Sequence, residues 1–307
     1  MSDLLDQINE YIGTEAQPIE YHIDAGSIKL FADSIMDTDP LYYDEGYART
    51  TRHGGIIAPR TFFGGATGLR GVSAGDSRTM SAINIPIPPG WTSIAAGDNF
   101  RFFAVVKPGD ILTCRERVAE AYEKQGRSGR LIFIAREKTF INQDGQVVMS
   151  RKLSGVSLRQ PLEKRTTENR QTISDDDNGA YLPALIVGPI TIRYLAMFAV
   201  ATAEFVDIHY DRDYAQSLGL PDVIIQGLYK TTIIAQMLKN WAGDGSVIRE
   251  LNVQHRGMDV AGNILKAGGR IVRTSRQQNC NIIECAVWVD NQYGQRTTVG
   301  TASLNIP

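Results

Sequence analysis

Apolar positions along the chain follow a helical spacing in some segments and a strand spacing in others. Residues 223–241 have apolar side chains on nearly every side and end at Ala242-Gly243, which is typical of a helix surrounded by protein. Shorter helical segments are expected at Ile28–Met36 and Tyr194–Phe205. The pattern therefore predicts several helices, one of them deeply buried.

Runs rich in strand-forming residues occupy the end of each half of the chain. Residues 130–141 and 146–158 flank an Asn-Gln-Asp-Gly turn, and residues 281–289 and 295–306 flank Asn-Gln-Tyr-Gly. Tight turns of Asn, Asp and Gly join neighbouring antiparallel strands. A long helix together with such strands predicts the α+β class, with the sheet wrapped around the helix.

Three blocks of sequence recur in the same order, which indicates an internal duplication. The first block contains Phe-Ala, Tyr-Asp and Tyr-Ala pairs, the second a Gly-(Asp/Asn)-Ile-Leu run followed by Arg, and the third the turn just described. The blocks are residues 31–48 and 198–215, residues 108–117 and 261–270, and residues 142–146 and 291–295. Their offsets are 167, 153 and 149 residues. The chain is therefore predicted to hold two copies of one structural unit.

A polar segment separates the two copies. Residues 161–179 are heavily charged and nearly free of large apolar side chains, so they cannot contribute to a core and are predicted to be a linker. We therefore expect an N-terminal unit at residues 1–160 and a C-terminal unit at residues 180–307. Each unit is long enough to bury a core of its own.

Composition narrows the classes of partner. The formal net charge of -2 leaves no basic excess to neutralise phosphates, so we expect no nucleic-acid partner. The first residues lack the pattern of a secretory signal, and no apolar run is long enough to span a membrane. Three cysteines are too few for a disulfide framework and are predicted to be buried thiols in a reducing cytoplasm.

The sequence also argues against bound metals and nucleotides. The four histidines do not show metal-binding spacings, and no glycine-rich phosphate loop occurs. We therefore expect no metal and no cofactor.

Candidate chemistry is concentrated in the second copy, where Glu204-Phe205-Val206-Asp207-Ile208-His209 is followed by Gln226-Gly227. This pattern resembles the MaoC-like, (R)-specific enoyl-CoA hydratase family, whose motif is Asp-x-Asn-Pro-(Ile/Leu)-His with a later His-Gly at a helix start. The family has the hot-dog fold. Its larger members are double hot dogs, and the first copy resembles their degenerate amino-terminal half. The resemblance covers nearly the whole chain outside the linker and implies a double hot dog.

The resemblance implies one acid/base site in the second copy. Glu204 occupies the position of the family's catalytic Asp, His209 that of its catalytic His, and Gly227 that of the backbone N–H that binds the developing oxyanion. Hydration of an unsaturated thioester needs these three functions, because one group takes a proton from water, another protonates Cα, and a donor stabilises the enolate-like oxygen.

The first copy lacks two of these groups. Tyr42 stands 167 residues before His209, and a tyrosine is a poor general base at neutral pH. Matching residues 56–59 to residues 224–227 with a one-residue gap places Pro59 opposite Gly227, and proline has no N–H to donate. By resemblance, the first copy would complete the fold and house the acyl group.

Four further residues are expected to shape a substrate-binding site. Val206, Asp207 and Gln226 replace the family's Asn, Pro and frequent His, which suggests an altered pocket for a polar or carboxylated substrate. Arg256 lies near the second Gly-(Asp/Asn)-Ile-Leu block, where the family's strands line the CoA channel, so it is a candidate for phosphate contact.

The expected function is therefore that of a hydro-lyase. It would add water to a trans-2-enoyl-CoA or remove it from an (R)-3-hydroxyacyl-CoA, and the acyl group could be dicarboxylic, of the mesaconyl or itaconyl type. Isomerisation, cyclisation or elimination on a non-CoA or carrier-bound substrate is one alternative, and a non-catalytic thioester-binding subunit is another. The two halves pair within one chain, so the resemblance allows a monomer as well as a homodimer.

Overall fold

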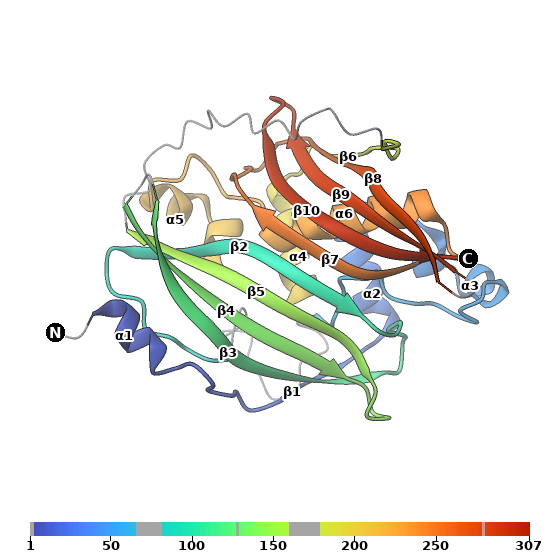
Figure 1. The fold of residues 1–307 in the computed structure, drawn as a ribbon, viewed down its shortest axis with the longest axis horizontal. Helices are drawn as coiled ribbons and strands as arrows, with labels where there is room; N and C mark the ends of the chain where they lie inside the picture. Colours follow the sequence, from blue (N-terminus) through green and yellow to red (C-terminus); the bar gives the residue numbers. More distant parts are fainter. Residues whose placement is uncertain (1–2, 66–81, 127–128, 160–178, 278–279) are drawn as a thin grey trace.

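The computed structural model describes residues 3–65, 82–126, 129–159, 179–277 and 280–307. These residues form a ten-stranded sheet with the order β1-β3-β4-β5-β2-β7-β10-β9-β8-β6, in which every neighbouring pair is antiparallel (Figure 1). The elements of the first half are α1 (Leu4–Asn9), β1 (Ile19–His22), α2 (Ala25–Ser34), η1 (Pro40–Tyr42), α3 (Glu45–Thr50), β2 (Trp91–Phe102), β3 (Ile111–Gly126), β4 (Gly129–Ile141) and β5 (Val147–Arg159). Those of the second half are β6 (Leu185–Val187), α4 (Ile192–Thr202), η3 (Asp207–His209), α5 (Arg212–Ser217), α6 (Gly227–Ala242), β7 (Val247–His255), β8 (Leu265–Gln277), β9 (Cys280–Asn291) and β10 (Arg296–Ile306).

The sheet confirms the predicted duplication. From the outer edges inward, β1-β3-β4-β5-β2 and β6-β8-β9-β10-β7 follow the same connection order, and the two halves meet where β2 pairs with β7. Gly97 on β2 allows this pairing, because a Cβ there would lie 2.5 Å from the Val253 carbonyl oxygen. The α+β class and the paired strands around each Asn-Gln-x-Gly turn are as predicted from the sequence.

Short polar motifs fold identically in the two halves. Asp44 and Asp211 cap α3 and α5, each accepting the N–H of a tyrosine three residues later at 2.9 Å. Met36 and Ala203, also 167 residues apart, both adopt a left-handed conformation, with φ of 56° and 57°. The repeated sequence therefore sets the same local chain path twice.

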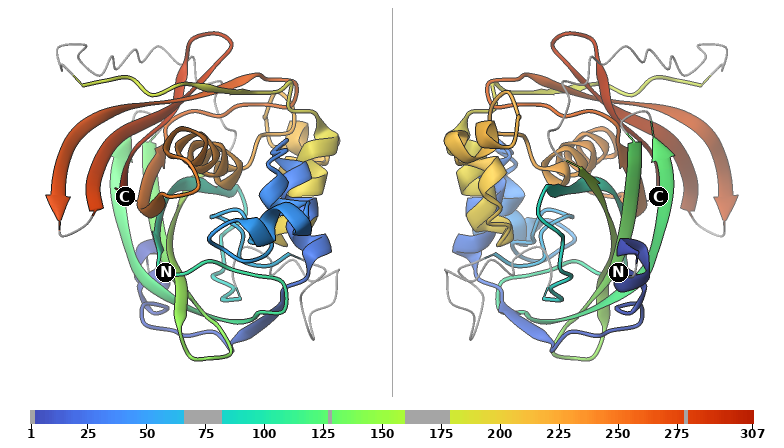
Figure 2. Two further views of the ribbon diagram at one scale, coloured as in Figure 1. Left: turned by 90° about the vertical axis from the view of Figure 1, so that its right-hand side faces the viewer. Right: turned by 90° about the vertical axis from the view of Figure 1, so that its left-hand side faces the viewer.

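The helices form a layer against the concave face of the sheet. Figure 2 shows α2 and α4 side by side, with α6 between this pair and the strands. The rings of Phe31 and Phe198, which occupy matching positions on α2 and α4, are 5.5 Å apart. On α6, Tyr229 packs against Phe198 and its hydroxyl donates to the Ser34 carbonyl at 3.1 Å.

The buried helix predicted at residues 223–241 is α6, but it begins later than expected. Every residue from Leu228 to Leu238 is buried. Ile224 and Ile225 lie outside the helix because their N–H groups donate to the carbonyls of Ile208 and Asp259, which holds this segment extended.

Two sequence predictions fall mainly outside the described residues. At the offset of 167 residues, the counterpart of α6 in the first half would be residues 60–75. Residues 60–65 form a turn and an irregular segment, and the rest lie outside the described residues. The predicted linker at residues 161–179 is described only at its last residue, so the proposed division of the chain there stays a prediction.

Candidate active site

His209 ends the short helix η3 in the second half, and its ring is oriented by the backbone. The side chain is buried, with the residue 6% exposed. Its Nδ1 lies 2.8 Å from the Ile224 carbonyl oxygen, and since a carbonyl only accepts, Nδ1 carries the proton. Burial lowers the pKa of His209 to about 4, although the bond to Ile224 opposes this. His209 is therefore neutral at physiological pH, with the lone pair of Nε2 free to accept a proton.

Glu204 lies in the turn between α4 and η3, directly after the left-handed Ala203. The turn is closed by a bond from the Glu204 N–H to the Ala199 carbonyl at 2.9 Å. The carboxyl group is buried, and its Oε2 has no hydrogen-bond partner among the described residues. Burial raises the pKa of Glu204 to about 7, with the Arg151 charge acting against the rise. A carboxyl group of this kind can give or take a proton near neutral pH.

The first half contributes a buried ion pair beside Glu204. Arg151 on β5 donates to Asp98 on β2 at 2.7 Å, and both side chains are nearly inaccessible to solvent. Asp98 also accepts from the Thr231 hydroxyl at 3.0 Å, and His255 Nε2 lies 3.5 Å from it. Although burial opposes ionisation, Arg151 and His255 hold the pKa of Asp98 well below its ordinary value. Asp98 is therefore ionised, and its carboxylate is the negative partner of Arg151 at the candidate site.

Gly227 is the first residue of α6, and His255 packs directly against it. A Cβ at Gly227 would lie 2.7 Å from His255 Nε2 and 3.0 Å from the Ala95 Cβ, so the space requires glycine. No side chain caps this 16-residue helix. The first N–H groups of a helix have no partners within it and carry partial positive charge, so they can bind a developing oxyanion.

The remaining predicted site residues have different surroundings. Gln226 is fully buried, donates to the Leu195 carbonyl at 3.1 Å, and leaves its Oε1 without a partner in the described structure. Val206 is half-buried and packs against the core. Asp207 is exposed and accepts from the Tyr210 hydroxyl at 2.7 Å, whereas Arg256 is exposed at the end of β7.

The same positions in the first half carry a different chemistry. Asp37 matches Glu204, and burial raises its pKa to about 6, against the effect of Lys239. Tyr42 matches His209 and is almost fully buried, and burial raises the pKa of its hydroxyl well above the ordinary value. The first half therefore keeps the carboxyl group and lacks the imidazole base.

The one-residue gap inferred from the sequence is wrong. The Ala58 N–H donates to the Val106 carbonyl at 2.8 Å, and the Ile225 N–H donates to the Asp259 carbonyl at the same distance. Ala58 therefore matches Ile225, and the offset of 167 residues continues without a gap. It is consequently Arg60, rather than Pro59, that lies opposite Gly227. Similar apolar pairs in the two copies suggested the gap, whereas the backbone hydrogen bonds set the register.

The described residues contain no cluster of three or more His, Cys, Asp or Glu side chains arranged to hold a metal ion. None of their helices combines the length and apolar character needed to cross a membrane.

Each half of the chain matches a known family of dehydratase domains. Residues 10–151 match the FAS1-like dehydratase domain region, and residues 159–289 match the MaoC-like domain. A relative from Thermomonospora curvata, named probable enoyl-CoA hydratase alpha subunit, is 29% identical over 153 residues, which is 47% of this chain and 47% of that protein. A Mycobacterium tuberculosis relative, named 3-oxo-4,17-pregnadiene-20-carboxyl-CoA hydratase beta subunit, is 32% identical over 77 residues, covering 25% of this chain and 58% of that protein.

The chain thus spans about half the length of these curated relatives. A solved structure described as a MaoC-like dehydratase matches the fold with a TM-score of 0.78 at 17% identity, covering 98% of this chain and 100% of that one. The two family matches, the duplicated sheet and this structural likeness lead to one conclusion. The chain belongs to the MaoC-like proteins and has the double hot-dog fold.

Proposed function

We propose that this protein hydrates a trans-2-enoyl-CoA, or dehydrates the corresponding (R)-3-hydroxyacyl-CoA, at a single site in its second half. The observation that carries the proposal is that one short segment, residues 204–209, holds both a neutral imidazole and a buried carboxyl group. His209 has its Nε2 lone pair free, and Glu204 has a pKa of about 7. The hydratase names of the two curated relatives support the same reaction class.

Each group has a separate role in hydration, and its protonation state determines that role. His209 Nε2 takes a proton from water as the water oxygen bonds to Cβ, and the electrons of the double bond move onto the thioester oxygen. The N–H groups at the start of α6 stabilise that oxygen. The electrons then return and Cα takes a proton from Glu204. Transfer of the His209 proton to Glu204 restores the site, so the net change is the addition of one water.

The narrower proposal concerns the acyl group. Val206, Asp207 and Gln226 depart from the family motif beside the acid and the base, and Gln226 Oε1 is a buried acceptor without a partner in the described part of the chain. An unsatisfied buried acceptor favours a ligand that can donate a hydrogen bond. We therefore propose mesaconyl- or itaconyl-type thioesters as substrates to compare with a simple enoyl group. Their second carboxyl group, when protonated, or the hydroxyl group of the hydrated product would donate a hydrogen bond to Gln226 Oε1.

The test follows loss of the enoyl absorbance of crotonyl-CoA and mesaconyl-CoA, with product masses measured in parallel. Turnover with a gain of one water is expected for the unmodified protein, and a loss of at least about a hundredfold is expected for His209→Ala. Arg49→Gln, which removes an exposed charge far from this turn in sequence, serves as the control. A product of unchanged mass would show an isomerase, and undiminished turnover by His209→Ala would exclude the assigned site.

A further inference from the structure

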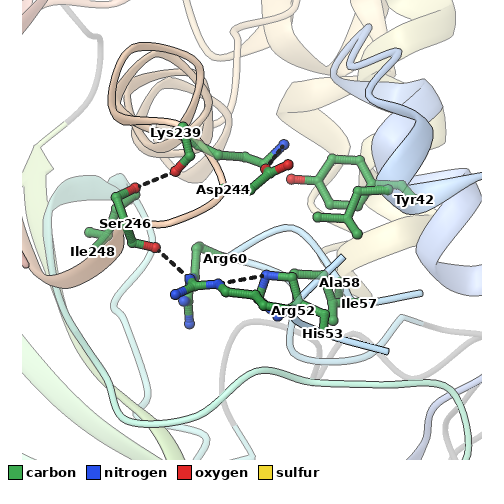
Figure 3. Close-up of a pocket in the computed structure, with 12 residues that line it drawn as sticks. Tyr42, Arg52, His53, Ile57, Ala58, Arg60, Lys239, Asp244, Ser246 and Ile248 are labelled. Carbon is green, nitrogen blue, oxygen red and sulfur yellow. Dashed lines mark hydrogen bonds and ion pairs between the residues drawn. The ribbon is translucent and has the colours of Figure 1, made fainter. Parts of the chain in front are cut away.

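A cavity lined by residues of both halves lies at Tyr42 and Arg60, the positions that match His209 and Gly227. It lies between η1, the segment of residues 52–60 and the C-terminal end of α6, and it opens to solvent. Buried Leu41, Ile57 and Ile248 form apolar parts of its wall. Figure 3 shows Arg52 and Arg60 next to each other, across the cavity from Tyr42 and Lys239.

The duplication shows which groups have been exchanged at this place. Tyr42 takes the position of the base His209, and Arg60 takes the position of Gly227, the candidate oxyanion donor. The general base is therefore lost, whereas a group that binds negative charge is retained in a stronger form, since a guanidinium carries a full charge. Such a site is suited to binding an anion without transforming it.

Two positive charges at the cavity have no acidic partner in the described structure. Arg60 is half-buried, and its hydrogen bond goes to the Ala104 carbonyl at 3.3 Å. Arg52 donates to the carbonyls of Gly245 and Ser246 at 2.9 and 2.8 Å, which leaves its charge uncompensated. Burial lowers the pKa of Arg60, and Arg52 lowers it further, as expected where positive charges meet.

Lys239 on the opposite wall differs in this respect. It forms ion pairs with both Asp39 and Asp244, so its positive charge is fully compensated, and Asp244 adds a negative charge to the same wall of the cavity. The uncompensated charge therefore belongs to the two arginines, on one side of the cavity. The Tyr42 hydroxyl, on the other side, forms no hydrogen bond with any described residue and is free to bond to a ligand.

We propose that this cavity binds an organic carboxylate with a short apolar chain. The planar guanidinium groups of Arg52 and Arg60 match a carboxylate, which can accept two hydrogen bonds from one fork. The apolar chain then lies against Leu41, Ile57 and Ile248. These apolar walls favour a carboxylate with a hydrocarbon chain over a small inorganic anion.

This binding site is separate from the proposed reaction centre. Gly227 lies at the proposed reaction centre and Lys239 lies at the cavity, and the two are twelve residues apart on α6. At 1.5 Å per residue, they are about 18 Å apart. A four- or five-carbon diacid on the catalytic thioester is too short to reach from one to the other. The proposal therefore does not depend on the reaction assigned to the second half.

The experiment measures binding of hexanoate and of inorganic phosphate by isothermal titration calorimetry and by saturation-transfer NMR. Hexanoate is expected to bind the unmodified protein, and Arg60→Gln is expected to weaken it about tenfold or more, through loss of a charge-assisted hydrogen bond. Arg52→Gln, at an exposed position, also removes the bonds to the Gly245 and Ser246 carbonyls and is expected to weaken hexanoate binding in the same direction. Arg49→Gln, which removes an exposed arginine paired with Glu45, is the matched control and should bind normally.

Three outcomes would overturn the proposal. Hexanoate could fail to bind at millimolar concentration, or it could bind equally well to Arg60→Gln and Arg52→Gln. Phosphate could also bind as tightly as hexanoate with the same dependence on the two arginines, which would contradict a role for the apolar chain. No turnover is measured, so the result is independent of whether the protein hydrates any thioester.

Discussion

Replacing Glu204 by Gln tests whether a buried carboxyl group with a raised pKa is present. The pKa of about 7 exceeds the ordinary value of 4.5, so folding favours the protonated form. The stability this provides is fully present below pH 4.5 and is lost as the pH rises through 7. At about 1.4 kcal/mol per pH unit, the loss between pH 5 and pH 8 amounts to about 2 to 3 kcal/mol. Gln cannot ionise, so Glu204→Gln should escape this loss.

The assay is urea unfolding of both proteins at pH 5 and pH 8, monitored by tryptophan fluorescence and circular dichroism. Relative to the unmodified protein, Glu204→Gln should become more stable by about 2 to 3 kcal/mol between the two pH values. Any fixed cost of the amide cancels in this difference, as do groups that titrate equally in both proteins. An equal stability difference at pH 5 and pH 8 would refute the inference that Glu204 is buried with a raised pKa.

Three other substitutions and one control substitution have defined outcomes. His209→Gln should reduce the rate of crotonyl-CoA hydration by at least about a hundredfold, with little change in the thermal unfolding temperature. A large fall in that temperature together with the loss of activity would indicate a structural role. Gly227→Ala should lower stability by about 1 to 3 kcal/mol in urea unfolding, because its Cβ would approach the neighbouring imidazole to 2.7 Å. Arg151→Met should lower stability by about 3 to 5 kcal/mol, because it removes the arginine partner of the buried Asp98 carboxylate. Arg117→Met, which breaks an exposed pair, should cost no more than about 1 kcal/mol, so equal losses would contradict the burial argument.

Local patterns predicted much of the fold because the duplication repeats them. The paired caps at Asp44 and Asp211 and the strands around each Asn-Gln-x-Gly turn depend on neighbours close in sequence. The apolar pattern predicts too early a start for α6, because the N–H groups of Ile224 and Ile225 donate to the carbonyls of Ile208 and Asp259. Apolar spacing cannot reveal a hydrogen bond of that kind.

The composition of the candidate site was harder to predict. Asp98, Arg151 and His255 come from strands of both halves, and nothing in the spacing of these residues indicates that they meet beside Glu204 and Gly227. A useful signal was present, however, because three ionisable residues at inward-facing strand positions require partners once buried. A prediction from the sequence that β2 pairs with β7 places Asp98 close to His255.

The pH dependence of kcat/KM for hydration of crotonyl-CoA tests the assigned acid/base pair most directly. Neutral His209 and protonated Glu204 are required together, so the account predicts a bell-shaped profile for the free enzyme. Activity should fall below about pH 4 as His209 gains a proton and above about pH 7 as Glu204 loses one. A rate that stays constant or rises from pH 7 to pH 9 would contradict the assignment of Glu204 as the acid.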